Sequence, residues 1–234
     1  MTRSVVLVSG GLDSAVVLAM AIEAGHEVFP FHVQYGQKNA RELLSAKALV
    51  AFFSLYDRLR VVTVDMQIRG SALTDEAVEV PSAQADGVPA TYVPARNTFM
   101  LGLAASFAES VSASRIWVGF NQLEDVYTPA GRASGVRFAN RVSSVGYPDC
   151  SDEFVDAMND LLKLGMRRPA KVVAPIIDMT KSEIIREALW LQVPIALTWS
   201  CYAGGAAPCG RCDACRARVA AFASLCKPDP AQLT

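Results

Sequence analysis

A short run rich in glycine and hydroxyl side chains lies near the start of the chain, at Val8-Ser9-Gly10-Gly11-Leu12-Asp13-Ser14. Two glycines let the backbone turn tightly and approach an anion closely. A helix beginning here would add unpaired N–H groups and the positive end of its dipole. Ser9 and Ser14 can donate hydrogen bonds to phosphate oxygens, and Asp13 can hold Mg²⁺ or cap the helix. The run therefore predicts a phosphate-binding loop.

The loop differs from two common nucleotide-binding patterns. It has no lysine, so it is not the Gly-x4-Gly-Lys-Ser/Thr loop, and its glycines do not follow Gly-x-Gly-x-x-Gly. The plain alternative is an ordinary strand-to-helix turn, in which Gly-Gly and an Asp or Ser cap are common. We favour phosphate binding because both hydroxyls and the acid follow an apolar run.

Four cysteines gather in the C-terminal part of the chain as Cys201-x7-Cys209-x2-Cys212-x2-Cys215. A Cys-x2-Cys pair can hold one metal ion from a tight turn, and four thiolates complete the tetrahedral coordination of Zn²⁺. A closed site leaves no position for a substrate, so the spacing predicts one structural Zn²⁺. An iron–sulfur cluster is the alternative, since cysteine ligation alone does not exclude it.

Alternating strands and helices must position these two groups. We predict strands at residues 3–8, 27–33, 60–65, 115–120 and 172–177, and helices at 14–24, 38–53, 97–111, 152–164 and 182–191. Such alternation produces βαβ units, which place helices on both faces of a parallel sheet. The sequence predicts an open α/β domain over residues 1–197, with a zinc-binding module at 198–234 packed on it.

Composition sets further limits. Of the 234 residues 52% are hydrophobic, and 22 Lys and Arg against 23 Asp and Glu give a net charge of −1. This excludes a disordered chain and does not favour a nucleic-acid partner. No apolar run approaches the ~20 residues needed to cross a bilayer, and no secretion signal is recognised, so we expect a cytoplasmic protein without membrane contact.

Two polar segments stand at expected helix starts. Arg96 and Asn97 follow Pro94, where a guanidinium could bind a carboxylate or phosphate through two hydrogen bonds. Tyr147-Pro148-Asp149 forms a turn before the next helix, so Asp149 could bind the N–H edge of a purine-like ring. The plain interpretations are a solvated arginine beside an Asn cap and an acid that serves only the turn.

Three further residues are candidates by position. Tyr35 and Gln37 follow the second strand at the carboxyl edge of the sheet, where ligands bind in open α/β folds. Lys181 opens a helix and could approach phosphates, although exposed lysines are common. We predict that all three contribute to one site with the phosphate loop.

The phosphate loop resembles the signature of the PP-loop N-type ATP pyrophosphatases. The chain as a whole resembles the 7-cyano-7-deazaguanine synthase family (QueC-type) along nearly its full length. The matching motifs, in order, are Ser9–Ser14, Tyr35-Gly36-Gln37, Val93-Pro94-Ala95-Arg96-Asn97, Gly146-Tyr147-Pro148-Asp149-Cys150 with Asp152-Glu153-Phe154, Lys181-x-Glu183-Ile184 and the four cysteines.

The resemblance implies a fold like the adenine nucleotide alpha-hydrolases, a homodimer, and a reaction in two stages. ATP with Mg²⁺ activates the carboxylate of 7-carboxy-7-deazaguanine and ammonia gives the amide; a second ATP activates the amide, which becomes the nitrile. The implied roles are ATP binding by Val8, Ser9, Gly10, Gly11, Leu12, Asp13 and Ser14, catalysis by Asp13, Ser14 and Lys181, and deazapurine binding by Tyr35, Gln37, Arg96, Asn97, Tyr147, Pro148 and Asp149.

One segment departs from the family pattern. About twenty extra residues follow Glu124-Asp125, and this insert, near 126–145, holds Arg132, Arg137 and Arg141 but no acid. The insert could form a lid, a dimer contact or a docking surface for another acceptor. The last role motivates an alternative function, in which a QueC-like paralogue joins the activated carboxylate to another amine, such as one on a protein.

The sequence disfavours two further functions. A tRNA-thiolating enzyme is disfavoured because only Cys150 and Cys226 remain outside the metal set, and they do not have Cys-x2-Cys spacing. We expect both of these cysteines to be buried. A non-catalytic zinc-and-nucleotide-binding module is disfavoured by the intact loop.

Overall fold

The computed structural model describes residues 1–38, 41–66, 68–82, 88–121, 136–138, 141–143 and 147–232. Its centre is a parallel sheet of five strands, in which the first strand of the chain lies in the middle. The order across the sheet is β3 (Arg60–Thr63), β2 (Glu27–Gln34), β1 (Arg3–Leu7), β4 (Arg115–Trp117) and β7 (Lys171–Val173).

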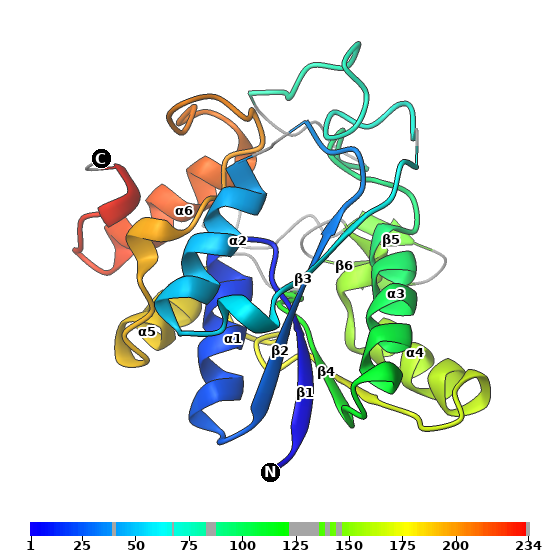
Figure 1. Cartoon of the computed structure of the whole chain (residues 1–234). Coiled ribbons are helices and arrows are strands. Elements are labelled where there is room, and N and C mark those ends of the chain that lie inside the picture. The colour runs from blue at the N-terminus through cyan, green and yellow to red at the C-terminus, as the bar shows by residue number, and fades with distance from the viewer. Residues whose placement is uncertain are drawn as a thin grey trace.

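Helices cover both faces of this sheet (Figure 1). One face packs against α1, α2, α5 and α6, and the other against α3 and α4. Their bounds are α1 (Leu12–Glu23), α2 (Arg41–Phe52), α3 (Arg96–Ser110), α4 (Asp152–Gly165), α5 (Lys181–Trp190) and α6 (Asp213–Ser224). The predicted α/β architecture is confirmed.

The alternation of side chains along β1 explains the two layers. Val5 points into the cluster of α3 and α4, whereas Val6 and Val8 belong to the cluster of α1, α2, α5 and α6. All three are fully buried, because a central parallel strand is covered on both faces. The order of the strands reverses between β1 and β4, so the carboxyl ends of these strands flank the position where ligands bind in such sheets.

Two predictions of local structure need correction. The last strand ends at Val173 rather than at residue 177, and turns follow, since Pro175 has no N–H to donate to a neighbouring strand. Cys226 is exposed, not buried, because the chain leaves α6 there through a left-handed residue with φ 51°. Cys150 is partly buried.

Most of the predicted insert lies outside the described residues. Within it, β5 (Val136–Phe138) and β6 (Arg141–Ser143) form an antiparallel pair. Four short 3₁₀ turns complete the described elements, at Tyr56–Arg58, Pro148–Cys150, Ile195–Leu197 and Pro230–Gln232.

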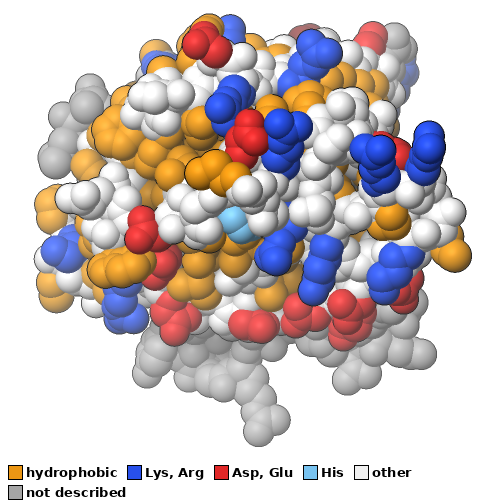
Figure 2. Space-filling model, turned by 60° about the horizontal axis from the view of Figure 1, so that its bottom comes forward, with side chains coloured by type: hydrophobic (Ala, Val, Ile, Leu, Met, Phe, Trp, Pro, Cys, Tyr) orange, Lys and Arg blue, Asp and Glu red, His pale blue; other side chains and the backbone are white. Residues whose placement is uncertain are grey.

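The face of the molecule shown in Figure 2 carries charges of both signs. Lys and Arg side chains lie interspersed with Asp and Glu on the face shown in Figure 2, as the net charge near zero leads one to expect. Among the described residues, no helix has the length and apolar character required to cross a bilayer.

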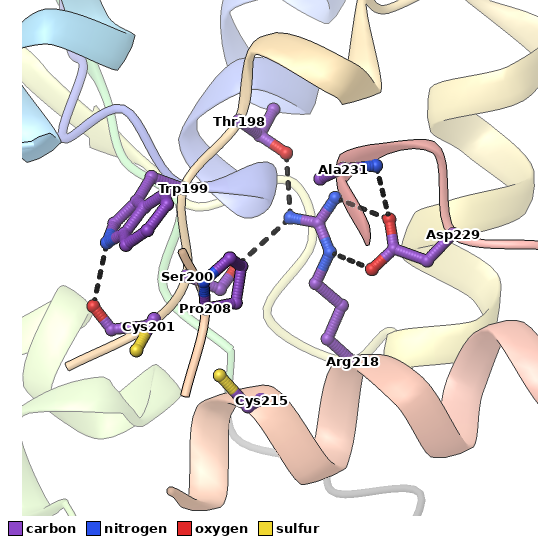
Figure 3. A pocket seen from close by; sticks show the side chains of 9 residues that line it. All are labelled: Thr198, Trp199, Ser200, Cys201, Pro208, Cys215, Arg218, Asp229 and Ala231. Atoms are coloured by element: carbon purple, nitrogen blue, oxygen red, sulfur yellow. Dashed lines mark hydrogen bonds and ion pairs between the residues drawn. The ribbon is translucent and has the colours of Figure 1, made fainter. Parts of the chain in front are cut away.

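A buried ion pair fastens the C-terminal segment to α6. The guanidinium of Arg218 donates to both carboxylate oxygens of Asp229, at 2.7 and 2.9 Å, and also to the hydroxyls of Thr198 and Ser200 (Figure 3). The two charged side chains are 7% and 4% exposed. Arg218 therefore joins the end of the chain to the segment that leads into the four cysteines.

We expect Asp229→Ala to lower the free energy of unfolding by about 3–5 kcal/mol, because it leaves a buried guanidinium without its charge partner. Denaturant unfolding of the full chain measures this change. The control is Asp160→Ala, which removes the exposed ion pair with Lys163 and should cost less than about 1 kcal/mol. Equal effects of the two substitutions would contradict the assignment.

Candidate active site

The loop between β1 and α1 is held in shape by its own serines. The hydroxyl of Ser14 donates to the carbonyl of Gly11 at 2.9 Å and accepts from the backbone N–H of Ser9 at 3.2 Å. The hydroxyl of Ser9 lies 3.1 Å from that of Ser14 and accepts from the N–H of Gly11. The serines thus fold the loop around the start of α1, whose first N–H groups have no partner within the helix.

Two glycines permit close contact at this loop. Gly10 has φ 93°, and a Cβ there would lie 2.3 Å from the carbonyl oxygen of Glu42 in the first turn of α2. Gly119, just after β4, lies so close that a Cβ would be 3.0 Å from the backbone of Asp13 and Ser14. Neither position has room for a side chain, so the loop is packed between α2 and the end of β4.

Lys181 reaches the phosphate loop from the start of α5. Its ammonium group lies 2.8 Å from both carboxylate oxygens of Asp13, although the two residues are 168 positions apart. Both side chains are partly exposed, Lys181 at 22% and Asp13 at 29%. The structure thus brings a cation and an acid together at the start of α1.

Two residues of the predicted ATP site support the loop from the core. Val8 is buried, its N–H donates to the carbonyl of Phe31, and its carbonyl contacts the ring of His32 at 2.7 Å. Leu12 is buried within the core around α1. Both fix the position of the loop, and their side chains do not face a ligand.

Asn97 and Asp149 form the centre of a second polar group at the same edge of the sheet. The backbone N–H of Asn97 donates to Oδ2 of Asp149 at 3.2 Å, and the Asn97 amide donates to the Asp149 carbonyl at 3.0 Å. Asp149 is 6% exposed, and its Oδ1 is buried without a hydrogen-bond partner in the part of the chain that the structure describes. A buried acceptor left unpaired costs stability, so Oδ1 is free to accept from a donor outside the described residues.

Arg96 and Tyr35 lie beside this pair. The guanidinium of Arg96 donates to the Tyr35 hydroxyl and to the Asn97 side-chain oxygen. Burial lowers the pKa of Arg96, but Tyr35, Cys150 and Asp149 together raise it by more. The pKa of Arg96 therefore lies above its ordinary value, and the guanidinium stays cationic. Burial raises the pKa of Tyr35, which therefore remains a neutral hydroxyl.

Tyr147 is held by residues from two other segments. Its hydroxyl lies 2.6 Å from that of Thr91 and hydrogen bonds to the side chain of Tyr202. Pro148 opens the short turn that places Asp149. Burial raises the pKa of the Cys150 thiol to about 12, so this thiol is not a nucleophile at neutral pH.

Sequence reasoning missed Thr91, Tyr202 and Glu42. Glu42 accepts a hydrogen bond from the amide of Gln37 at 3.4 Å, and burial raises its pKa to about 7 although the nearby Arg96 opposes this. A signal for Glu42 was available, since it is an acid five residues after the Tyr-Gly-Gln motif at the predicted helix start. Thr91 and Tyr202 carry no comparable signal.

The four cysteines meet as predicted. The ligand sulfurs of Cys201, Cys209, Cys212 and Cys215 all lie within 4.8 Å of one another, so the group can hold a metal ion. Backbone N–H groups donate to two of the sulfurs at 3.3–3.4 Å. Burial opposes ionisation of Cys209, yet N–H groups of Arg211 and Cys212 lower its pKa to about 6, whereas burial raises the pKa of Cys215.

Trp199 joins the cysteine group to the phosphate loop. Its backbone N–H donates to the carbonyl of Gly10 at 2.9 Å, and its indole N–H donates to the carbonyl of Cys201, also at 2.9 Å (Figure 3). The guanidinium of Arg41 lies over the Trp199 ring, 5.0 Å from its centre. The cysteine group is therefore connected to the phosphate loop through Trp199.

Fold and site together define an α/β protein of the nucleotide-binding type, in which a loop suited to phosphates lies near a buried polar group around Asn97 and Asp149. A family model described as "Queuosine biosynthesis protein QueC" matches residues 3–146 and 135–226. The chain belongs to this family, which confirms the resemblance seen in its motifs.

Named relatives agree with the assignment. A 7-cyano-7-deazaguanine synthase from Nostoc sp. (strain PCC 7120) is 40% identical, and the match covers 97% of this chain and 96% of that one. The synthase of Picrophilus torridus is 39% identical over 95% of this chain and 87% of its own. Among solved structures, a 4-thiouridine synthetase bound to RNA and ATP is 16% identical, covers 95% of this chain and 54% of its own, and has a TM-score of 0.48. Because that structural similarity is low, the family assignment depends on the sequence comparisons.

We expect removal of the bound metal by a chelator to weaken ATP binding as well as lower Tm, because Trp199 connects the cysteines to Gly10. Structural metal contributes several kcal/mol, so Tm should fall by on the order of 10 °C. Calorimetric titration with ATP and thermal unfolding measure the two effects, and adding Zn²⁺ back should reverse both. The control is Cys226→Ser, outside the cluster. Unchanged ATP affinity in the metal-free chain would contradict the connection.

Proposed function

We propose that this protein converts 7-carboxy-7-deazaguanine, ammonia and ATP into 7-cyano-7-deazaguanine, the product for which its relatives are named. The observation that carries the proposal is the unpaired Oδ1 of Asp149, buried beside Arg96 and near the phosphate loop. A guanine-like ring has N–H groups that suit this acceptor, and a carboxylate on the ring suits the Arg96 guanidinium. ATP at the neighbouring loop would meet that carboxylate.

The residues divide the work between two halves of the site. The N–H groups of the loop 9–14 bind the phosphates of ATP, and Lys181 adds positive charge next to Asp13. Tyr35, Gln37, Asn97 and Tyr147 shape the deazapurine pocket, with Pro148 fixing the turn. Catalysis then depends on holding the carboxylate against the α-phosphate and on stabilising the charge that develops during adenylation.

The metal ions, the oligomeric state and the location of the protein are part of the same proposal. Asp13 is the residue we expect to help hold Mg²⁺ with ATP, and its carboxylate oxygens suit that hard cation. Four thiolates suit Zn²⁺, and the closed set of ligands gives that ion a structural role. A homodimer and a cytoplasmic location accompany the family function.

The alternative function, transfer of the activated carboxylate to a protein amine, finds no support in the comparisons. It depended on the basic insert, most of which lies outside the described residues. We therefore do not propose it.

The direct test is the mass of the product. Purified protein incubated with 7-carboxy-7-deazaguanine, ATP, Mg²⁺ and ammonia should yield the nitrile, with the amide as an intermediate and AMP as the by-product. Absence of both amide and nitrile from an active preparation that hydrolyses ATP to AMP would refute the proposal.

Asp149→Asn should raise KM for the deazapurine about 10- to 100-fold, because a hydrogen bond to a charged group contributes about 1.5–3 kcal/mol. KM for ATP should change little. Steady-state kinetics measures both constants, and Asp160→Asn on the exposed face of α4 serves as the control. Equal changes in the two KM values would instead indicate general disruption of the site.

A further inference from the structure

Glu42 occupies a position between the two halves of the site, and neither the sequence motifs nor the proposed roles use it. Its backbone carbonyl touches Gly10 of the phosphate loop, at the contact that excludes a Cβ. Its carboxylate is close enough to Arg96, in the half of the site that we propose for the deazapurine, for the guanidinium charge to lower the carboxylate's pKa. Any bond formed between a carboxylate held by Arg96 and the α-phosphate of ATP must lie in this same region.

Gln37 fixes which atom of Glu42 is available. The backbone N–H of Tyr35 donates to Oε1 of Gln37 at 2.7 Å, and this sets the orientation of the amide. Its NH₂ group then donates to Oε2 of Glu42 at 3.4 Å. One carboxylate oxygen is thus occupied as an acceptor, and Oε1 accepts no hydrogen bond from the described residues.

The neighbouring carboxylates are engaged elsewhere. Both oxygens of Asp13 lie 2.8 Å from the Lys181 ammonium. Asp149 accepts from the backbone of Asn97 and offers its other oxygen to the ring in our proposal. Neither kind of engagement applies to Glu42: in the described part of the chain no cation is directly paired with it, and our proposal assigns no ligand to its Oε1.

The charges around Glu42 leave it able to exchange a proton at neutral pH. Burial raises its pKa to about 7, while the cationic Arg96 and the amide of Gln37 act in the opposite direction. The other titratable group that faces it is Tyr35, which stays neutral because burial raises its pKa. A base with a pKa near the working pH is the most effective in general base catalysis.

The proposed reaction requires such a base, because ammonia carries three N–H bonds and a nitrile nitrogen carries none. We propose that Glu42 is the proton acceptor for the nitrogen during C–N bond formation and again during nitrile formation; this rests on the proposed function. In the first stage the ammonia lone pair attacks the acyl carbon of the adenylate, Glu42 takes one N–H proton, and the C–O bond to AMP breaks. In the second stage the adenylated amide loses its remaining N–H protons as its C–O bond to AMP breaks, and Glu42 passes each proton to solvent.

Glu42→Gln tests the proposal, because it keeps the shape and an oxygen that can accept from Gln37 but removes the base. Two half-reactions are measured separately on the metal-loaded full chain. Exchange of labelled pyrophosphate into ATP, dependent on 7-carboxy-7-deazaguanine and without ammonia, reports adenylation. Ammonia-dependent formation of the amide, followed by mass, reports the step assigned to Glu42.

We expect Glu42→Gln to slow amide formation about 10²- to 10⁴-fold, the range of general base catalysis, with the exchange reaction within about threefold of wild type. At constant free ammonia, the wild-type rate should rise with pH through about 7 as Glu42 loses its proton. The rate of the Glu42→Gln variant should not rise with pH in this range. Glu42→Asp should restore part of the wild-type rate. Glu23→Gln, exposed at the end of α1, is the matched control.

Two results would overturn the inference: a normal rate of amide formation in Glu42→Gln, or a parallel loss of the exchange reaction, which would mean a structural role. Failure of the proposed function is distinguishable from both. In that case the wild-type protein itself forms no amide from ammonia.

Discussion

The contact at Gly10 is the constraint on which the rest of the site depends. Its carbonyl accepts the backbone N–H of Trp199, and its Cα lies against the carbonyl of Glu42 where no Cβ fits. The phosphate loop, the start of α2 and the segment leading to the cysteines therefore meet at one residue. Only glycine satisfies both the contact distance and the positive φ of 93°.

This junction makes the cysteine group part of the site rather than a distant attachment. The backbone N–H of Trp199 donates to the loop at Gly10, and Tyr202, next to a cysteine, hydrogen bonds to Tyr147, which we propose to bind the deazapurine. Arg218 anchors the same segment through its buried pair with Asp229. These contacts join residues of the predicted module at 198–234 to residues of the predicted domain at 1–197, through backbone and side-chain groups.

Sequence patterns predicted the parts of this molecule that depend on local spacing. The phosphate loop, the order of strands and helices, and the four cysteines each have a signature within a few residues. Contacts over long separations have none: Lys181 was a candidate from its place at a helix start and from the family resemblance, but its contact with Asp13 was not predicted, and Thr91 and Tyr202 could not be found. The early end of β7 was missed because the apolar residues continue past the strand. Ile176 and Ile177 look like part of it but lie in the turn that begins at Pro175.

The most direct test of this account is the ATP affinity of Gly10→Ala, compared by calorimetric titration with that of Gly25→Ala. Both glycines have positive φ, but a Cβ at Gly25 meets nothing within 4 Å, whereas at Gly10 it meets the Glu42 carbonyl at 2.3 Å. The account predicts that Gly25→Ala binds ATP like wild type and that Gly10→Ala, still folded by circular dichroism, binds it at least about 10-fold more weakly, a loss of about 1.4 kcal/mol. Equal ATP affinity in the two variants would contradict it.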